Sequence, residues 1–353
     1  MTDRALARAV EAWFRRAARD LPWRRAPRDP WASLVAELML QQTQVSRVIE
    51  KHRAFLERFP APAALAEANL DEALAAWEGL GYYRRARNLK AAAEQIVERH
   101  AGRTPADAAS LIELKGVGRY TAGAVASIVF GRREPIVDGN VARVLVRLAG
   151  QPMRSGEAST MRWAWGRAEA LVNACEDPAA LNEGLMELGA TVCTPRRPRC
   201  GECPVASSCA ARAAGAEEAF PLPKRAAPAR DAHHAIVLAT DARGRALVER
   251  RPERGLWAGM WQPAGLESEE APVDPAELAI ALGAEGLERA GALTHVTSHR
   301  LVRLVVYVAT AAQATGPRRW ATREEIASLA MASPHRRVLR RWICSASPAS
   351  AMG

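Results

Sequence analysis

Residues 111–130 read LIELKGVGRYTAGAVASIVF, in which two apolar segments flank the tight turn Lys115-Gly116-Val117-Gly118. Gly116 and Gly118 let the backbone turn sharply and leave amide groups exposed at the start of the second segment. Such amides, together with the positive end of a helix dipole, bind phosphate. A plain helix–helix turn is the alternative, but an L-x-G-V-G turn followed by a helix is typical of a helix-hairpin-helix motif.

A second stretch, PIVDGNVARVL (135–145), follows the hairpin and places Asp138 immediately before another helix-like segment. An aspartate in that position is most simply an N-cap, which accepts a hydrogen bond from the first turn of the helix. A carboxylate whose position is fixed by a helix start is also well placed for catalysis. The two interpretations of Asp138 are compatible.

A third stretch, ELMLQQTQV (37–45), places Glu37 between apolar residues of a predicted helix, with Gln41 and Gln44 on the same face at i+4 and i+7. A carboxyl group there is either a salt-bridged structural residue or a group that desolvation keeps protonated. Taken alone, the pattern favours the structural interpretation.

Four cysteines lie further along the chain with the spacing C-x6-C-x2-C-x5-C, namely Cys193, Cys200, Cys203 and Cys209. Four thiolates converging in one loop suit either a structural zinc or a 4Fe–4S cluster. Zinc sites usually bring their ligands as two short C-x2-4-C knuckles, whereas this loop has one, so we predict the cluster. Two disulfides are the remaining alternative. The chain shows no signal peptide, which argues against them.

Arginine dominates the charge of this loop and of the whole chain. Arg196, Arg197 and Arg199 lie between the first two cysteines, where they are suited to gripping phosphates. Lys+Arg is 49 against 39 for Asp+Glu, giving a net charge of +10. A solvated charge run is the alternative for the loop, but the overall balance agrees with a polyanionic partner.

The 353 residues favour two domains. Residues 1–212 show 3.6-residue apolar periodicity and short turns, which predict an almost wholly helical domain. An Ala- and Pro-rich stretch at 213–232 is typical of a linker. Residues 233–345 mix strand-like runs with helical ones and predict an α+β domain, and residues 346–353 are expected to be disordered.

Together these features resemble a family. A helix-hairpin-helix, an aspartate some twenty residues later and a four-cysteine loop are the layout of the endonuclease III superfamily of DNA glycosylases. Several stretches resemble its MutY-type adenine DNA glycosylases: LPW (21–23), ELMLQQTQV (37–45), GLGYYRRARNL (79–89), PIVDGNVARVL (135–145) and LGATVCT (188–194). GLWAGMWQP (255–263) and TSH (297–299) are similar to the MutT-like domain of that family.

The resemblance implies a mostly α N-terminal glycosylase domain with its hairpin at 111–130 and an iron–sulfur cluster loop at 193–209, followed by an α+β Nudix/MutT-like domain. It implies removal of adenine mispaired with 8-oxoguanine or guanine in duplex DNA. Glu37 would be the general acid, and Asp138 would stabilise the oxocarbenium-like sugar. Asn140 would orient Asp138, and Tyr120 would face the same pocket.

The resemblance also implies the DNA contacts. The target base must be flipped out of the duplex, and Gln42 and Tyr82 match family residues that wedge into the stack. Core packing is the alternative for Tyr82 and its neighbour Tyr83, and we expect it for one of the two. On the strand that is not cut, Ser298 and His299 would read 8-oxoguanine, although this chain has Thr297 where the family usually has phenylalanine.

Tyr120 implies a monofunctional glycosylase. Members of the superfamily with lyase activity place a lysine there to form a Schiff base with the sugar. The chain has only Lys51, Lys90, Lys115 and Lys224, which offer no obvious substitute.

Two alternatives belong to other classes of function. A non-catalytic DNA-damage binder is disfavoured because Glu37, Tyr120, Asp138 and Asn140 occur together. A nucleoside-diphosphate hydrolase would need clustered glutamates after Gly265, and LESEEAPVDPAEL lacks that arrangement. We therefore expect a monomeric, cytoplasmic DNA repair enzyme that acts on the nucleoid and holds one 4Fe–4S cluster, with no membrane partner.

Overall fold

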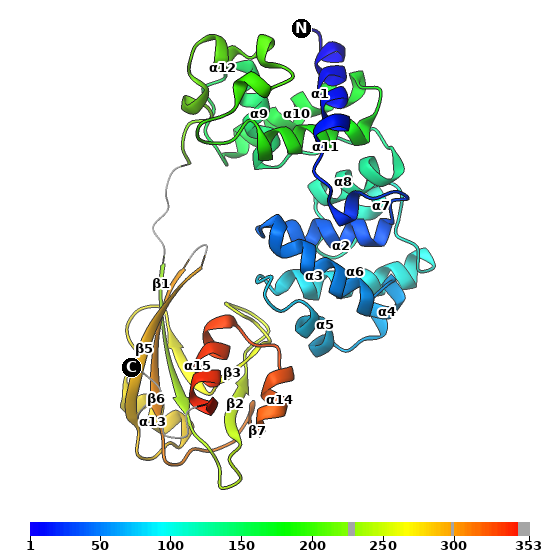
Figure 1. The fold of residues 1–353 in the computed structure, drawn as a ribbon. Helices are drawn as coiled ribbons and strands as arrows, with labels where there is room; N and C mark the ends of the chain where they lie inside the picture. Colours follow the sequence, from blue (N-terminus) through cyan, green and yellow to red (C-terminus); the bar gives the residue numbers. More distant parts are fainter. Residues whose placement is uncertain (225–229, 298–299, 345–353) are drawn as a thin grey trace. The chain divides into compact units, whose positions relative to one another are not determined.

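The computed structural model describes residues 1–224, 230–297 and 300–344, with side chains up to Arg341. The chain divides into two compact units (Figure 1). The first comprises Met1–Ala76 and Arg85–Arg225, and the second comprises Trp77–Arg84 and Ala226–Gly353. None of the described helices is both long enough and apolar enough to span a bilayer.

The first unit is built from helices joined by short turns. Their bounds are α1 Asp3–Ala17, α2 Pro30–Leu40, α3 Val45–Arg58, α4 Pro62–Glu67, α5 Leu70–Ala76, α6 Arg84–His100, α7 Ala108–Ile112, α8 Arg119–Phe130, α9 Gly139–Ala149, α10 Ala158–Ala174, α11 Pro178–Thr191 and α12 Ala210–Ala213. Single 3-10 turns occupy Pro22–Arg24, Cys200–Glu202, Ala206–Ser208 and Glu217–Ala219.

Aspartate N-caps set the starts of several of these helices. Asp29, Asp107, Asp138 and Asp177 each accept a hydrogen bond from a backbone amide in the first turn of the helix that follows. The capped amides have no partner within the helix, so each carboxylate fixes a helix start. The predicted capping role of Asp138 is confirmed.

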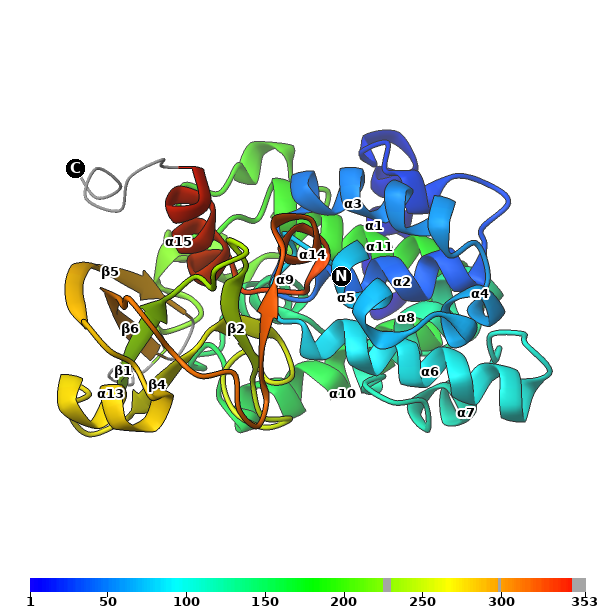
Figure 2. The same cartoon turned by 90° about the horizontal axis from the view of Figure 1, so that it is seen from below.

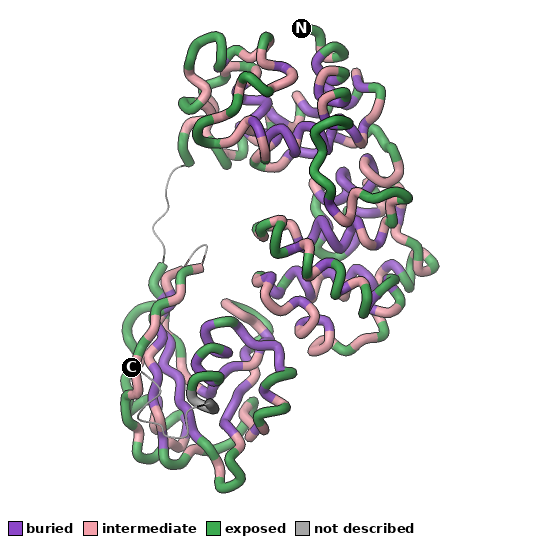
Figure 3. The backbone as a smooth tube through the Cα atoms, viewed as in Figure 1, coloured by how far each residue is buried: buried purple, intermediate pink, exposed green. Residues whose placement is uncertain are grey.

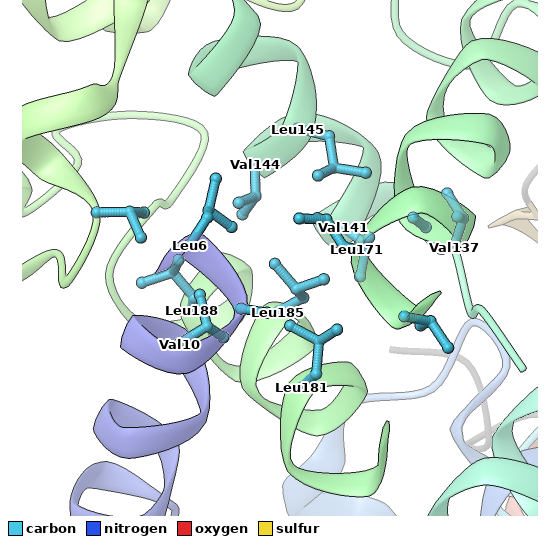
Figure 4. Packing of buried hydrophobic residues seen from close by; sticks show 14 of the residues in the cluster. Leu6, Val10, Val137, Val141, Val144, Leu145, Leu171, Leu181, Leu185 and Leu188 are labelled. Carbon is cyan, nitrogen blue, oxygen red and sulfur yellow. The ribbon is translucent and has the colours of Figure 1, made fainter. Parts of the chain in front are cut away.

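One apolar core joins α1, α9, α10 and α11 (Figure 4). Leu6 and Val10 of α1 meet Val141 and Leu145 of α9 and Leu185 of α11, and all five are at least 93% buried. The apolar spacing of α1 predicts this inward face. Because Asp138 caps the start of α9, this core fixes the helix on which the site depends.

The second unit combines two sheets with flanking helices. Its elements are β1 Arg230–Leu238, β2 Ala246–Arg250, β3 Trp261–Pro263, β4 Gly265–Ser268, α13 Pro275–Leu282, β5 Glu288–Val296, β6 Arg300–Val308, β7 Arg318–Ala321, α14 Arg323–Ser328 and α15 Ser333–Cys344. One sheet has the order β4-β1-β6-β5, with β1 and β6 parallel, and the other has the order β3-β2-β7.

Both faces of the larger sheet are covered within this unit (Figure 2). Ile236 of β1 packs toward Val338 and Leu339 of α15, and Val237 of β1 packs toward Leu278 of α13. Neighbouring strand residues point to opposite faces, which is why successive residues of β1 belong to different cores. β1 accordingly ends in a continuous run of buried residues, drawn purple in Figure 3.

The predicted fold class, a helical first part and an α+β second part, is confirmed. The domain boundaries lie elsewhere than the sequence composition suggested. Residues 213–224 pack with the first unit, since Arg147 Nε donates to Phe220 O at 2.8 Å and Leu222 N to Met153 O at 2.8 Å. Backbone carbonyls and amides make these contacts, and composition does not report them. β1 begins at Arg230, and the predicted disordered tail, 346–353, lies outside the described residues.

Replacing Leu185 by alanine tests the central core. Leu185 is fully buried, so its truncation should lower the free energy of unfolding by about 2–5 kcal/mol. Val97 on α6 is 41% exposed, and Val97→Ala should change it by less than about 0.5 kcal/mol. Thermal unfolding followed by circular dichroism measures both, and equal shifts of the two variants would contradict this core.

Candidate active site

A cavity of about 750 Å³ opens within the first unit, between α2, the hairpin before α8, the start of α9 and one face of α11. Its lining includes all four residues predicted to be catalytic, Glu37, Tyr120, Asp138 and Asn140. Three of the predicted DNA-contacting residues, Gln42, Gly116 and Gly118, also line it. Residues about 100 positions apart in the sequence therefore meet at one cavity.

Glu37 presents a carboxyl group that is almost removed from water. It lies on α2, is 9% exposed, and its Oε2 atom has no hydrogen-bond partner among the described residues. Burial raises the pKa of Glu37 from 4.5 to about 7, although a hydrogen bond with Tyr120 opposes the rise. Near neutral pH a substantial fraction of this carboxyl group is therefore protonated, as a proton donor requires.

Asp138 occupies a different environment in the same cavity. Its Oδ1 accepts from the amide of Val141 at 2.7 Å, and its Oδ2 accepts from Asn140 Nδ2 at 3.1 Å. Burial raises the pKa of Asp138 above its usual value, whereas these two donors and the charge of Arg143 oppose the rise. Hydrogen bonds to both oxygens favour the carboxylate, which suits an electrostatic role.

Tyr120 lies in the first turn of α8 and faces the same carboxyl groups. Its hydroxyl group donates to Met186 Sδ at 3.1 Å. Burial, followed by the charges of Glu37 and Asp138, raises the pKa of Tyr120 well above 10. The side chain therefore remains a neutral phenol that can donate a hydrogen bond but cannot act as an amine nucleophile.

A buried network of ion pairs, which we did not predict, forms part of the cavity lining. Glu183 and Glu187 of α11 are at most 3% exposed. Arg24 Nε donates to Glu183 Oε1 at 2.9 Å, and Arg19 Nε donates to Glu187 Oε1 at 2.6 Å. Arg28 also donates to Glu183. The sequence does contain a signal for this network, since two glutamates four residues apart on an otherwise apolar helix need buried partners.

Two further arginines that the sequence analysis missed connect α9 to the cysteine loop. Arg143 donates from Nη2 to Asn140 Oδ1 at 2.8 Å and from Nε to Cys193 O at 2.8 Å. Arg147, 2% exposed, donates to Cys193 Sγ at 3.3 Å and to Thr194 O at 2.7 Å. The helix that Asp138 caps therefore also holds the first cysteine of the loop.

The four loop cysteines fit an iron–sulfur group. All four are free thiols that line one shared cavity together with Arg147. Within the described residues no three His, Cys, Asp or Glu side chains come close enough to hold a single ion. Four thiol sulfurs around one common space are the set of ligands that an iron–sulfur group takes.

The predicted DNA-contacting residues lie in several places. Gln42 and Tyr82 both have positive φ, 56° and 47°, and both are exposed, Tyr82 at 43%. Arg196 and Arg197 are exposed, and the Arg197 amide donates to Glu218. Ser298 and His299 lie outside the described residues.

The structure also decides the predictions made for Tyr83 and Gln44. Tyr83 is 7% exposed, so the prediction that one of the two adjacent tyrosines belongs to the core is confirmed for Tyr83. The predicted position of Gln44 on the Glu37 face is wrong, because α2 ends at Leu40 and Gln44 precedes α3. The backbone turn at 41–43 breaks the helical periodicity on which that prediction rested.

Comparisons with known proteins identify the class first. Residues 35–169 match the HhH-GPD superfamily of base excision DNA repair proteins, residues 193–209 match the iron–sulfur binding domain of endonuclease III, and residues 235–341 match the NUDIX domain. Thus the hairpin and the cavity belong to a DNA glycosylase fold, and the cysteine loop is an iron–sulfur binding segment.

The relatives narrow the class to a family. An adenine DNA glycosylase of Rattus norvegicus is 34% identical over 95% of this chain and 77% of its own length. One of Homo sapiens is 46% identical over 57% of this chain and 38% of its own length. The structure of a thermostable thymine-DNA glycosylase covers 60% of this chain and 97% of its own, with 27% identity and a TM-score of 0.54. The chain belongs to the adenine DNA glycosylase family.

The two hairpin glycines give a matched pair of substitutions. Gly116 has φ +80°, and a Cβ there would lie 2.4 Å from Asn88 Cβ. Gly116→Ala should therefore lower the free energy of unfolding by at least about 2 kcal/mol and weaken duplex binding. A Cβ on Gly118 would meet no atom within 4 Å, so Gly118→Ala should cost no more than about 1 kcal/mol. Equal costs in thermal unfolding would show that the turn does not need its left-handed glycine.

Proposed function

We propose that the chain flips adenine out of duplex DNA, where it is mispaired with 8-oxoguanine or guanine, and removes it by hydrolysis. The observation that carries the proposal is the pairing of two unlike carboxyl groups in one cavity. Glu37 is desolvated and has a pKa of about 7, whereas Asp138 accepts hydrogen bonds on both oxygens. Glycoside hydrolysis needs such a pair, one member acting as acid and the other as carboxylate.

In the proposed reaction, Glu37 gives its proton to N7 of the extruded adenine as the bond between N9 and the sugar C1′ breaks. The bonding electrons leave with the base, and the positive charge that develops on the sugar faces the Asp138 carboxylate. A water molecule then adds to C1′ and loses a proton to a carboxylate. Asn140 keeps Asp138 oriented through its 3.1 Å hydrogen bond.

The identity of residue 120 supports a monofunctional enzyme. The Tyr120 phenol lies beside both carboxyl groups, in the position where a lyase would need a lysine amine. Strand cleavage through a Schiff base therefore has no nucleophile at this place in the cavity. We propose that the chain leaves an intact abasic strand as its product.

We further propose that the cysteine loop holds one 4Fe–4S cluster, with Cys193, Cys200, Cys203 and Cys209 as ligands. The cluster would supply a rigid centre for the loop, whose first ligand hydrogen-bonds to α9. The exposed Arg196 and Arg197 of the loop would then contact phosphates. The partner is double-stranded DNA with the mispair, bound by a monomer in the cytoplasm.

We also propose that the second unit reads the base opposite adenine. Support comes from the NUDIX match at 235–341 and from the polar residues Ser298 and His299 that follow β5 in the sequence. Thr297 Oγ1 donates to Arg300 O at 3.1 Å and accepts from Arg300 N at 3.0 Å, which joins the end of β5 to the start of β6. The Thr297 hydroxyl is thus occupied by hydrogen bonds to the backbone of Arg300 and does not replace the phenylalanine of the family.

The central test compares wild type with Glu37→Gln on duplexes containing A:8-oxoguanine, with A:T as control. Single-turnover adenine release by wild type should fall as the pH rises through about 7, because ionised Glu37 has no proton to give. Glu37→Gln should release adenine roughly 10²–10⁴-fold more slowly than wild type below about pH 7, and this difference should shrink above about pH 7, where wild-type Glu37 is itself ionised. Near-normal release by this variant would exclude Glu37 as the acid.

Stability provides a second measurement on the same variant. The folded-state pKa of Glu37 exceeds its ordinary value, so the folded protein binds this proton more tightly than the unfolded chain does. Ionisation of Glu37 therefore costs stability as the pH rises from about 4.5 through about 7. Glu37→Gln, which cannot ionise, should melt at a temperature no lower than wild type above that range.

Metal analysis tests the cluster. The purified protein should contain about four irons per chain, and Cys200→Ser should lose iron and give less soluble protein. Cys175 is buried in the core and does not line the cavity of the four loop cysteines, so Cys175→Ala should keep the iron. One zinc per chain without iron would overturn the assignment.

A further inference from the structure

The turn that follows α2 holds a conformation that its residues do not favour. Gln42 has φ 56°, a left-handed value that costs a non-glycine residue about 1–3 kcal/mol. Its side chain is nevertheless exposed and lines the active-site cavity. Neighbouring contacts must supply the free energy that keeps this turn in place.

Arg85, on α6, supplies those contacts. Its side chain belongs to a residue that is only 7% exposed. Nη1 donates to Leu38 O at 2.9 Å, to Met39 O at 2.8 Å and to Gln41 O. The last carbonyls of a helix lack partners within the helix, and a cation there also favours the helix dipole. Arg85 therefore caps α2 from a separate helix.

The same guanidinium group also holds the far side of the turn. Arg85 Nη2 donates to Thr43 Oγ1 at 3.0 Å, so its two terminal nitrogens contact both neighbours of Gln42. Gln41 is held in addition from α8, where its Nε2 donates to Thr121 Oγ1 at 3.3 Å. The residues before and after Gln42 are thus fixed, while the Gln42 side chain itself projects to the surface.

We propose that Arg85 is a positioning residue for extrusion of the target base. It holds Gln42 in its left-handed conformation so that the Gln42 side chain can enter the duplex stack. Arg85 is buried and does not itself touch DNA. Arg85 lies three residues after Tyr82, which is also exposed and also has a positive φ. The inference rests on the proposed function, because it assigns Gln42 to the duplex.

A purely structural role would leave a different signature. Glu37 is on the helix that Arg85 caps, so general damage to α2 would slow excision of every adenine equally. A wedge matters only where a stacked base must be extruded, and extrusion is cheaper for a base that has no pairing partner. Comparing paired with unpaired adenine therefore separates the two roles.

The experiment uses Arg85→Met in the full chain, which removes the donors and keeps an unbranched side chain of similar reach. Single-turnover excision from an A:8-oxoguanine duplex should fall roughly 10–100-fold, the range expected for a misplaced positioning group. Excision of adenine opposite an abasic site should fall only a few-fold. The emission of 2-aminopurine placed at the target position, which rises on unstacking, should fall in parallel with the duplex rate.

Two further variants complete the design. Gln42→Ala should show the same dependence on substrate, and the double variant should be no slower than the slower single variant, because both act at one step. Arg99→Met, an exposed arginine at the other end of α6, should match wild type. Equal losses on both substrates, or losses that add in the double variant, would overturn the proposal.

Arg85→Lys covers the case in which the methionine variant does not fold. Lysine keeps the charge and can reach the carbonyls, but it lacks the planar fork that also contacts Thr43. It should show a smaller loss with the same preference for unpaired adenine, and a loss independent of pairing would again overturn the role. If wild type released no adenine, the proposed function would fail, whereas the 2-aminopurine emission would still decide the role of Arg85.

Discussion

The 2.7 Å hydrogen bond from the Val141 amide to Asp138 is the contact on which the arrangement of the cavity depends. It starts α9 and places a carboxylate at that start. The same helix carries Arg143 and Arg147, which hold Cys193 by its carbonyl and its sulfur. The carboxylate and the cysteine loop therefore share one rigid support, and the apolar core around α9 and α11 holds this support in place. A displacement of the first turn of α9 would move both.

The chemistry of the cavity depends on the different environments of two of its carboxyl groups, Glu37 and Asp138. Glu37 and Asp138 are both largely buried, but only Asp138 receives hydrogen bonds on both oxygens. Burial disfavours the charged form of each carboxyl group, and hydrogen bonds restore it for one of them. Arginines pair with Glu183 and Glu187 in the lining of the cavity, and their positive charges offset the negative charges of these two carboxylates. The cavity can therefore hold a proton and a negative charge a short distance apart.

The turn around Gln42, at the edge of the cavity, also depends on contacts made by distant residues. Gln42 is presented to solvent in an unfavourable conformation, and the cost is offset by buried contacts that Arg85 and Thr121 make with its neighbours. Gln42 was predicted by resemblance, whereas Arg85 was not predicted from the sequence. The contacts of Arg85 run to backbone carbonyls more than 40 positions away, and a carbonyl has no signature in the sequence.

The sequence by itself determined the features that depend on interactions over a few residues, because capping, turn geometry and periodicity are local. These features are the hairpin glycines, the four-cysteine spacing, the division into a helical and a strand-containing part, and the helix starts at Asp29, Asp107, Asp138 and Asp177. Only the tertiary structure decided that Glu37 loses its water, that Glu183 and Glu187 meet arginines from the N-terminal segment, and that residues 213–224 pack with the helical unit. Those outcomes depend on which distant groups exclude solvent from one another, and desolvation is a property of the packed assembly of helices.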